Sequence, residues 1–248
     1  MKRVAIVGGT KGIGRAVARL IAARGDRVAL LGRDAADLAA SAADLAARAP
    51  AGSPAPAAGI LDLARAETFE AALEDVTRQL GGLDTVIVTA GAFGTQDALE
   101  TDAAARQRVL STNFAQTIEL CEVARVRLLA AGGGTLCVLG SVAGDRARKP
   151  VVLYGATKAG LAYYLHGIDL RYRDAGLRTV LVKPGFVRTG MTAGLPEPPF
   201  AANPEDVAPA IVKAIDRGTH QIYVPAIWAL VMLVIRWLPG AVMRRVKF

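Results

Sequence analysis

The sequence holds few cysteines and lacks the cysteine spacing of a metal site or a disulfide framework. Cys121 and Cys137 are the two cysteines among 248 residues, and neither belongs to a recognisable motif. We interpret both as buried thiols of a protein in a reducing compartment. No clustered metal ligands accompany them, so we expect no metal site.

Aromatic residues and long apolar runs are also scarce. Aromatics form 5% of the chain and no basic run is interleaved with them, which argues against nucleic-acid binding despite the net charge of +8. The apolar run of the N-terminus stops at Gly8, too early for a signal peptide, and no stretch reaches the roughly 18 apolar residues of a spanning helix. We therefore expect a cytoplasmic protein. The excess positive charge fits solvated helix faces, a phosphate-bearing cofactor or an anionic membrane surface.

Short apolar runs alternate with alanine-rich helical patterns along the whole chain, and hydrophobic residues make up 52% of it. This alternation predicts an α/β fold with crossover helices on both faces of a doubly wound, mostly parallel sheet, the Rossmann arrangement. The length suits one domain, which we place at residues 1–225 with a tail at 226–248. About seven strands are expected, near Arg3–Val7, Arg27–Leu31, Ala57–Leu61, Thr85–Thr89, Thr135–Leu139, Arg178–Val182 and Gln221–Val224.

Three helices carry the positions that matter for function. We expect them over Arg15–Arg24, over Asp102–Ala130 in one or two pieces, and over Val152–Asp174. Asp34 has the character of a helix N-cap.

A glycine-rich loop follows the first expected strand and leads into the first helix. Glycine permits the tight turn, the approach of the backbone to a pyrophosphate and close packing of helix on strand, while the helix N-terminus offers N–H donors to phosphates. At this position in an α/β chain a dinucleotide site is favoured over a simple tight turn. The loop residues expected to bind it are Gly8, Thr10, Lys11, Gly12, Ile13 and Gly14.

The end of the second strand predicts the kind of dinucleotide. An NAD site places an acid there, whereas this chain has Gly32 followed by Arg33, with Lys11 as a second cation. Two cations without the acid suit a 2′-phosphate, so we predict NADP(H); in the alternative, Arg33 is a surface residue and Asp34 takes the acid's place. After the third strand, Asp62 and its neighbour Leu63 are expected at the adenine, although Asp62 would serve equally as an N-cap.

A tyrosine and a lysine four positions apart, Tyr154 and Lys158, share one helix face. An ammonium beside a phenol stabilises the phenolate and lowers its pKa from about 10 toward neutrality. Alone, the pair would more often mean an exposed lysine stem on a ring. It gains meaning because the loops after successive parallel strands meet at one edge of the sheet. These loops contribute Ala90, Gly91, Ser141, Pro184 and Gly185.

Together these residues resemble the short-chain dehydrogenase/reductase family over roughly Arg3 to Val224. The resemblance implies that Ser141 polarises a carbonyl, that Tyr154 transfers the proton, and that Lys158 tunes the tyrosine and holds the nicotinamide ribose. It implies that Asn113 supports a water-linked proton path. It further implies that the segment Pro184, Gly185, Val187 and Thr189 contacts the nicotinamide carboxamide. The structural alternatives are a helix cap for Ser141 and a buried amide bridging backbone groups for Asn113.

Two departures from the family pattern stand out. Thr89 replaces the asparagine that braces the central strand, so we expect different local packing there. The C-terminus lacks the Asp-Gly-Gly segment of tetrameric members, which argues against their tetramer contact; we expect a homodimer.

The tail is apolar all round from Ile227 to Ile235, and Trp237 and terminal cations follow it. Such a segment fits the membrane interface, as a peripheral contact, or a helix packed on the substrate pocket or on a dimer partner. Residues 190–203, with Met191 and Phe200, are expected to form an apolar substrate lid.

The tail and the segment around Ser141 also resemble a narrower group, the reductases that complete the epimerisation of decaprenylphosphoryl-ribose. This implies an NADPH-dependent reduction of a ketone on an apolar or lipid-linked substrate, with the cations Arg146, Arg148 and Lys149 meeting a phosphate; a solvated loop is their alternative. Reduction of a soluble ketoacyl thioester or small ketone is the second hypothesis. A dinucleotide-sensing module without catalysis and a membrane scaffold are further hypotheses, against which the intact Tyr154 and Lys158 count.

Overall fold

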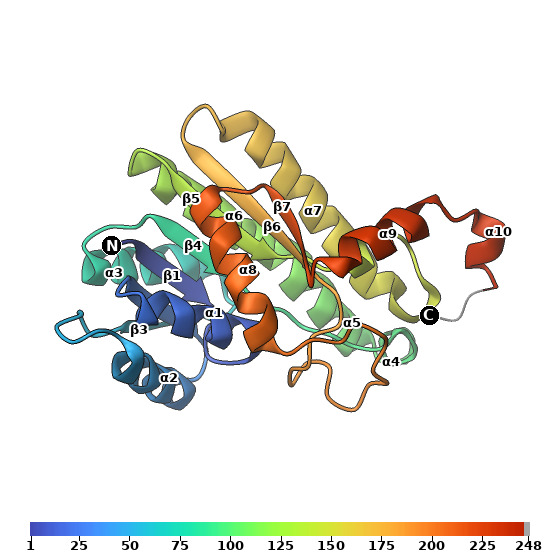
Figure 1. Ribbon diagram of the computed structural model, residues 1–248, viewed down its shortest axis with the longest axis horizontal. Coiled ribbons are helices and arrows are strands. Elements are labelled where there is room, and N and C mark those ends of the chain that lie inside the picture. The colour runs from blue at the N-terminus through green and yellow to red at the C-terminus, as the bar shows by residue number, and fades with distance from the viewer. Residues whose placement is uncertain (246–248) are drawn as a thin grey trace.

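The computed structural model describes residues 1–245, so residues 246–248 of the predicted tail lie outside it. One seven-stranded sheet forms the centre of the molecule, in the order β3-β2-β1-β4-β5-β6-β7 with every neighbouring pair parallel (Figure 1). This confirms the predicted doubly wound α/β fold. The strands are β1 (Arg3–Val7), β2 (Arg27–Gly32), β3 (Ala57–Ile60), β4 (Thr85–Val88), β5 (Gly134–Leu139), β6 (Leu177–Pro184) and β7 (Gln221–Val224).

Helices cover both faces of the sheet, because successive strand residues point to opposite sides. Val4 and Ile6 of β1 pack with α1, α2 and α8, whereas Ala5 and Val7 pack with α3, α6 and α7. The helices are α1 (Gly12–Ala23), α2 (Ala35–Arg48), α3 (Phe69–Leu80), α4 (Gln96–Thr101), α5 (Ala103–Leu110), α6 (Gln116–Ala130), α7 (Val152–Tyr172), α8 (Pro204–Arg217), α9 (Ile227–Trp237) and α10 (Gly240–Met243). Short helical turns are η1 (Ala66–Thr68), η2 (Ser111–Ala115), η3 (Val142–Gly144) and η4 (Lys149–Val151).

The strand order reverses between β1 and β4, and Thr89 ties the two strands together there. Its hydroxyl lies 3.1 Å from the carbonyl oxygen of Val7 and 3.0 Å from that of Gly8, as a donor to both. A Cβ on Gly14 would lie 2.3 Å from the carbonyl oxygen of Gly8 and 2.4 Å from Oγ1 of Thr89. Threonine thus supplies a compact brace at the position where we expected the packing to change, and glycine is required opposite it.

The expected helix over 102–130 is interrupted by the π turn η2. Thr117 Oγ1 donates a 2.7 Å hydrogen bond to the carbonyl oxygen of Thr112, five residues earlier, within this widened turn. Asn113 lies in η2 and is 1% exposed. The π turn therefore directs the asparagine toward the carboxyl end of β4, and such turns are frequent at functional sites.

Both cysteine thiols are fully buried, in agreement with their predicted character. Cys121 lies in α6 and Cys137 in β5, each 0% exposed, and burial raises the pKa of both thiols above its ordinary value. Asp34 is also confirmed as an N-cap: its carboxylate accepts a 2.9 Å hydrogen bond from the backbone N–H of Asp37 at the start of α2.

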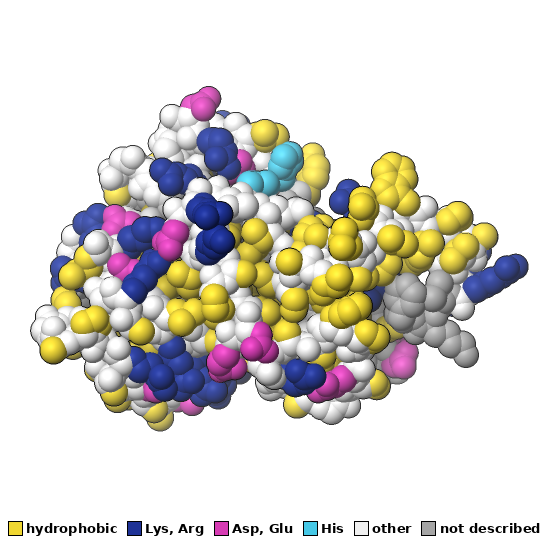
Figure 2. Space-filling view, in the orientation of Figure 1, with side chains coloured by type: hydrophobic (Ala, Val, Ile, Leu, Met, Phe, Trp, Pro, Cys, Tyr) yellow, Lys and Arg dark blue, Asp and Glu magenta, His cyan; other side chains and the backbone are white. Residues whose placement is uncertain are grey.

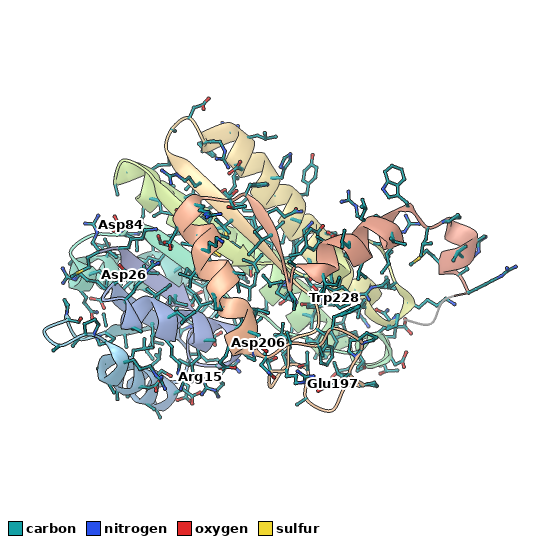
Figure 3. The ribbon with its side chains drawn as sticks, viewed as in Figure 1. Arg15, Asp26, Asp84, Glu197, Asp206 and Trp228 are labelled. Carbon is teal, nitrogen blue, oxygen red and sulfur yellow. The ribbon has the colours of Figure 1, made fainter. Side chains whose placement is uncertain are left out.

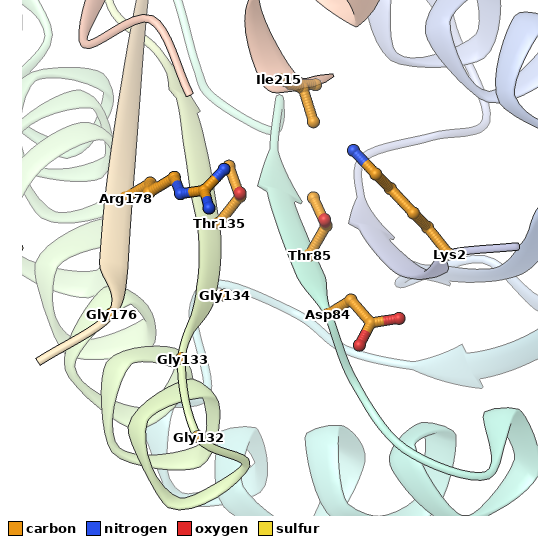
Figure 4. A pocket seen from close by; sticks show the side chains of 10 residues that line it. All are labelled: Lys2, Asp84, Thr85, Gly132, Gly133, Gly134, Thr135, Gly176, Arg178 and Ile215. Carbon is orange, nitrogen blue, oxygen red and sulfur yellow. The ribbon is translucent and has the colours of Figure 1, made fainter. Parts of the chain in front are cut away.

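The amino ends of β4, β5 and β6 surround an open pocket of about 300 Å³ (Figure 4). Lys2, Asp84 and Arg178 lie around it among glycines. Lys2 pairs with Asp216, and Asp84 pairs with Arg3. None of the residues predicted to act on substrate or cofactor lines this pocket, which opens at the edge opposite to theirs.

Candidate active site

The glycine loop after β1 leaves room for a ligand at the N-terminus of α1. Gly8 and Gly12 have φ angles of 88° and 52°, in the left-handed region that favours glycine. Lys11 is the N-cap residue of α1, and its side chain makes no capping hydrogen bond. The side chain of Lys11 therefore does not compete for the N–H groups of the first turn of α1, the part of a helix at which a pyrophosphate binds.

A second pocket, of about 200 Å³, opens between this loop and the end of β2. Its lining joins Thr10, Lys11, Gly32, Arg33, Asp34 and Asp37. The Lys11 ammonium lies 2.6 Å from the Asp37 carboxylate, and both side chains are partly solvated. Figure 2 shows Lys and Arg side chains gathered at the lower left, where α1 and α2 lie in Figure 1; Arg15 of α1 is labelled there in Figure 3. The two predicted 2′-phosphate ligands, Lys11 and Arg33, thus share one pocket, and Asp34 is engaged as the cap of α2.

The end of β3 contributes Asp62 and Leu63. The Asp62 carboxylate accepts a 3.0 Å hydrogen bond from the backbone N–H of Ala64, which closes a turn. The N-cap residue of the following turn η1 is Arg65, so the alternative role of Asp62 as a helix N-cap is wrong. Leu63 is buried and belongs to the core.

Close backbone packing of η3 on α7 sets the distance between the predicted serine and tyrosine. A Cβ on Gly144 would lie 2.7 Å from the carbonyl carbon of Lys158, and a Cβ on Gly155 would lie 2.7 Å from the carbonyl oxygen of Ala143. Two glycines therefore let the turn after Ser141 rest directly on the helix of Tyr154. Ser141 Oγ also accepts a 3.1 Å hydrogen bond from the N–H of Ala143, so it caps η3 as well.

Burial controls the proton affinities of Tyr154 and Lys158. Burial raises the pKa of Tyr154 to about 12, and the Ser141 hydroxyl opposes this in part. Burial lowers the pKa of Lys158 to about 8. We expected the Lys158 ammonium to lower the pKa of Tyr154. In the protein without a bound dinucleotide this pKa is raised instead, so the expectation is wrong for that state. The Lys158 ammonium lies 5.8 Å from the centre of the phenol ring and donates instead to the carbonyl oxygen of Leu139, at 2.9 Å.

Asn113 meets the same site from the opposite side. Its Oδ1 accepts from the N–H of Ala92 and its Nδ2 donates to the carbonyl oxygen of Ala92, both at 2.7 Å. A Cβ on Gly91 would lie 3.1 Å from Oδ1 of Asn113 and 3.9 Å from Nζ of Lys158. Asn113 therefore fixes the loop after β4, as the structural alternative held, and the same contacts bring Ala90 and Gly91 beside Lys158.

The segment after β6 faces the glycine loop and the tail. Val187 is buried and forms a bridge with Ala202, which closes the base of the expected lid. A Cβ on Gly12 would lie 3.1 Å from Cγ2 of Thr189. A Cβ on Gly185 would lie 2.0 Å from Nε1 of Trp228, so the indole of Trp228, which is labelled in Figure 3, lies directly against Gly185. The four residues that we predicted to contact the nicotinamide carboxamide thus lie along one wall of the site: Pro184, Gly185, Val187 and Thr189.

The tail packs against the protein with one face of α9. Trp228, Met232 and Ile235 are at most 8% exposed and form a cluster with Val142, the residue after Ser141. The carbonyl oxygen of Leu238 accepts a 2.9 Å hydrogen bond from Arg146, and that of Arg244 accepts one from Lys149. Two of the three cations predicted to meet a phosphate therefore hold the tail instead.

Arg148 is the third of these cations. Its Nε is buried without a hydrogen-bond partner among the described residues, and burial lowers its pKa.

Sequence reasoning missed several side chains that shape the site. Phe93 packs edge-on against Tyr154, with ring centres 5.1 Å apart. The sequence feature that could have indicated Phe93 is its position two residues after Gly91, in the loop that follows β4. Asp145, Lys183 and Tyr223 form a buried polar network next to the site. The sequence contained a weak signal for it, because Lys183 is a charged residue between the apolar run 180–182 and Pro184.

The arrangement joins an uncapped helix N-terminus for a pyrophosphate to a half-buried phenol, a half-buried hydroxyl and a buried ammonium at the same sheet edge. Residues of this kind fit a nicotinamide dinucleotide and a proton transfer beside it. The site thus defines a dinucleotide-dependent oxidoreductase.

Comparison with known proteins assigns the family. The sequence model for short chain dehydrogenase matches residues 2–199. An uncharacterized oxidoreductase of Mycobacterium tuberculosis is 33% identical over 244 residues, 98% of this chain and 96% of the relative. Carbonyl reductase family member 4 of Xenopus tropicalis is 28% identical over 219 residues, 85% of this chain and 89% of the relative. The chain belongs to the short-chain dehydrogenase/reductase family.

A solved structure supports the fold independently. A short-chain type dehydrogenase/reductase from Mycobacterium ulcerans superimposes with a TM-score of 0.81 at 23% identity, covering 90% of this chain and 87% of that one. The protein is accordingly an oxidoreductase of this family that uses a nicotinamide dinucleotide.

The pKa values of Tyr154 and Lys158 predict how activity depends on pH. With a pKa of about 12, Tyr154 keeps its proton, whereas Lys158 loses its charge as the pH rises through about 8. We expect kcat/KM for carbonyl reduction to be level below about pH 8 and to fall above it. The measurement is kcat/KM from about pH 6 to about pH 10. In Lys158→Arg the falling limb should move to higher pH, because a guanidinium keeps its charge; a level wild-type profile would contradict the assignment.

Proposed function

We propose that the protein reduces a ketone to a secondary alcohol with NADPH, on an apolar or lipid-linked substrate. The observation that carries the proposal is the contact of η3 with α7, which brings Ser141 to a half-buried, protonated Tyr154 with Lys158 behind it. A raised tyrosine pKa suits this direction, since the phenol is then present as a proton donor at neutral pH.

The residues of the chain have separate tasks in this reaction. When bound, the reduced nicotinamide supplies a hydride to the carbonyl carbon. Ser141 donates a hydrogen bond to the carbonyl oxygen, and Tyr154 gives its proton to that oxygen as negative charge develops there. The Lys158 ammonium stabilises the phenolate left behind.

The preference for the phosphorylated dinucleotide rests on the pocket beside the glycine loop. Arg33 and Lys11 both line it, and the adjacent Asp34 is occupied as a helix cap. A 2′-phosphate there would pair with both cations. Asp62 and Leu63 would then lie on the adenine side.

The substrate proposal rests on the surfaces around the carbonyl position. Met191 and Phe200 of the lid are 42% and 54% exposed, and the Phe200 ring stands edge-on to Trp228 at 6.5 Å. An apolar chain could lie along these side chains. Arg148, whose buried Nε has no hydrogen-bond partner within residues 1–245, would suit the phosphate of a substrate such as a polyprenylphosphoryl ketosugar. The similarity to a carbonyl reductase favours the second candidate, a small ketone or a soluble ketoacyl thioester.

The outward face of α9 supports peripheral binding to a membrane. Leu230, Leu233, Val234 and Trp237 follow helical spacing and are 63%, 57%, 64% and 82% exposed. Figure 2 shows hydrophobic side chains gathered over α9. Arg236 and Arg244 supply positive charge for an anionic lipid surface. Within residues 1–245, no helix is both long and apolar enough to cross a bilayer. The cytoplasmic location stays a prediction.

The homodimer also stays a prediction, for which α7 offers a surface. Val152, Tyr163 and Leu170 are 48%, 84% and 72% exposed along one side of this helix. A second copy of the chain would cover this apolar face.

The proton donor is tested by Tyr154→Phe, which keeps the ring against Phe93 and removes the hydroxyl. We expect kcat for NADPH-dependent ketone reduction to fall by about 10²- to 10⁴-fold while NADPH affinity changes little. Steady-state kinetics against polyprenylphosphoryl ketosugars, ketoacyl thioesters and small ketones, with NADPH titrations, provide both readings. Wild type that binds NADPH and reduces no ketone of the panel would favour the sensing module.

The cofactor preference is tested by Arg33→Ala. Loss of a charge-assisted hydrogen bond should weaken NADPH binding by about tenfold or more and leave NADH binding nearly unchanged. Arg78→Ala serves as the control, since Arg78 is also an exposed arginine but lies on α3 and does not line the pocket of Arg33. Equal losses for the two dinucleotides would contradict the 2′-phosphate site.

Membrane binding is tested by the double variant Leu233→Ser and Trp237→Ser. Sedimentation with vesicles of phosphatidylglycerol and phosphatidylcholine should fall by at least about fivefold, because two large apolar groups no longer enter the interface. Val126→Ser removes a similarly exposed apolar residue from α6, outside both the tail and the proposed dimer surface, and should change nothing. If wild type does not sediment with these vesicles, the membrane proposal is wrong.

A further inference from the structure

A buried ion pair joins the segment after Ser141 to the strand that ends in Pro184. The Lys183 ammonium lies 2.6 Å from Oδ1 of Asp145, and the Tyr223 hydroxyl donates a 2.7 Å hydrogen bond to Oδ2. Both carboxylate oxygens are thus engaged. The side chains of Lys183 and Asp145 are 9% and 4% exposed.

The three residues come from three separate elements. Asp145 directly follows η3, Lys183 lies in β6 and Tyr223 lies in β7. Tyr223 also packs against the cluster of Trp228, Met232 and Ile235, so the network reaches the base of the tail. Burial, reinforced by the Asp145 carboxylate, raises the pKa of Tyr223 to about 12, so its hydroxyl stays a donor at neutral pH.

The network begins where the backbone pairing of β5 and β6 stops. The ladder ends at the pair Leu139 and Val182, and the last backbone hydrogen bond runs from the N–H of Gly140 to the carbonyl oxygen of Val182. Beyond this point no backbone pairing joins the segment that follows β5 to the end of β6. The first segment carries Ser141 and the second carries Pro184, and they form opposite walls of the proposed site. The ion pair is therefore a direct link between the two walls.

A buried ion pair is an expensive way to hold two segments together. Removing both charges from water costs more than well-packed apolar side chains would, and the pair stabilises only if its geometry is nearly ideal. What it adds is a defined distance and direction, since a carboxylate with two partners accepts few arrangements. Because the ion pair lies beside the proposed reaction site, this fixed distance and direction can control how the two walls of the site are placed relative to each other.

We infer that Asp145, Lys183 and Tyr223 are positioning residues that set Ser141 relative to Pro184–Gly185. The inference rests on the proposed ketone reduction. The network keeps the serine hydroxyl, which orients the carbonyl, in register with the wall that receives the nicotinamide. An error of about 1 Å in such a register slows a reaction by orders of magnitude.

The central variant is the double substitution Asp145→Asn and Lys183→Met. It removes both charges together, so neither is left buried and unpaired, and it nearly preserves side-chain volume. We expect its thermal midpoint to stay close to that of wild type while kcat falls about tenfold or more. The KM for NADPH should change less than about threefold. The deuterium isotope effect with 4-deuterated NADPH should rise, because hydride transfer becomes the slow step.

Two further variants separate positioning from general stability. Tyr223→Phe removes one hydrogen bond and keeps the ion pair, so it should give a smaller loss of kcat of the same kind. Asp84→Asn breaks the Arg3–Asp84 pair at the opposite sheet edge, and should lower the thermal midpoint with kcat and the isotope effect unchanged. If the double variant retains wild-type kcat and isotope effect, the network is structural only and the inference is wrong.

Hydrogen exchange tests the inference independently of any activity. In the double variant the backbone amides of 140–146 and 185–189 should exchange faster, whereas those of the glycine loop at 8–14 should not. Unchanged exchange in the first two segments would overturn the inference even if the protein reduces no ketone. Absent ketone reduction in wild type, with the expected exchange, would overturn the proposed function and leave the positioning of the two walls standing.

Discussion

The parallel pairing of β1 with β4 is the constraint on which the rest of the structure depends. Because the strand order reverses there, the loops that follow the two strands leave in opposite directions and open a crevice between them. Thr89 holds that crevice to a fixed width through its contacts with the carbonyl oxygens of Val7 and Gly8. Gly14 permits α1 to approach the same point. The glycine loop, the α1 N-terminus and the Asn113 contacts all follow from this junction.

A second close approach moves the Tyr154–Lys158 pair away from solvent, at the site that we propose for the reaction. Gly144 and Gly155 allow η3 to lie on α7, and the resulting burial acts on Tyr154 and Lys158 in opposite directions. The phenol holds its proton more tightly and the ammonium holds its proton less tightly. Desolvation disfavours the charged form of each. The site alone is therefore prepared to donate a proton, which agrees with reduction as the proposed direction.

The tail shows how one short helix packs on the protein and still has a free apolar face, so the observed packing is compatible with the proposed membrane contact. Trp228, Met232 and Ile235 face Val142, and Leu230, Leu233 and Trp237 face outward. A helix of period 3.6 that is apolar all round can pack on the protein with one face and offer the other to a membrane. The packed face also explains why Arg146 and Lys149 meet backbone carbonyls of the tail.

The sequence by itself determined the strands, the fold class, the glycine loop and the side chains that we propose to react. These depend on local patterns: apolar runs, helical spacing, and glycines at the ends of strands. Only the tertiary structure decided that Tyr154 is raised in pKa, that Asn113 bridges Ala92, and that Asp145 pairs with Lys183. Asp145 and Lys183 are 38 residues apart in the chain, and burial depends on every element that packs around a group. Contacts of that range leave no local pattern in a sequence, because their energy arises only when separate strands and helices are brought together.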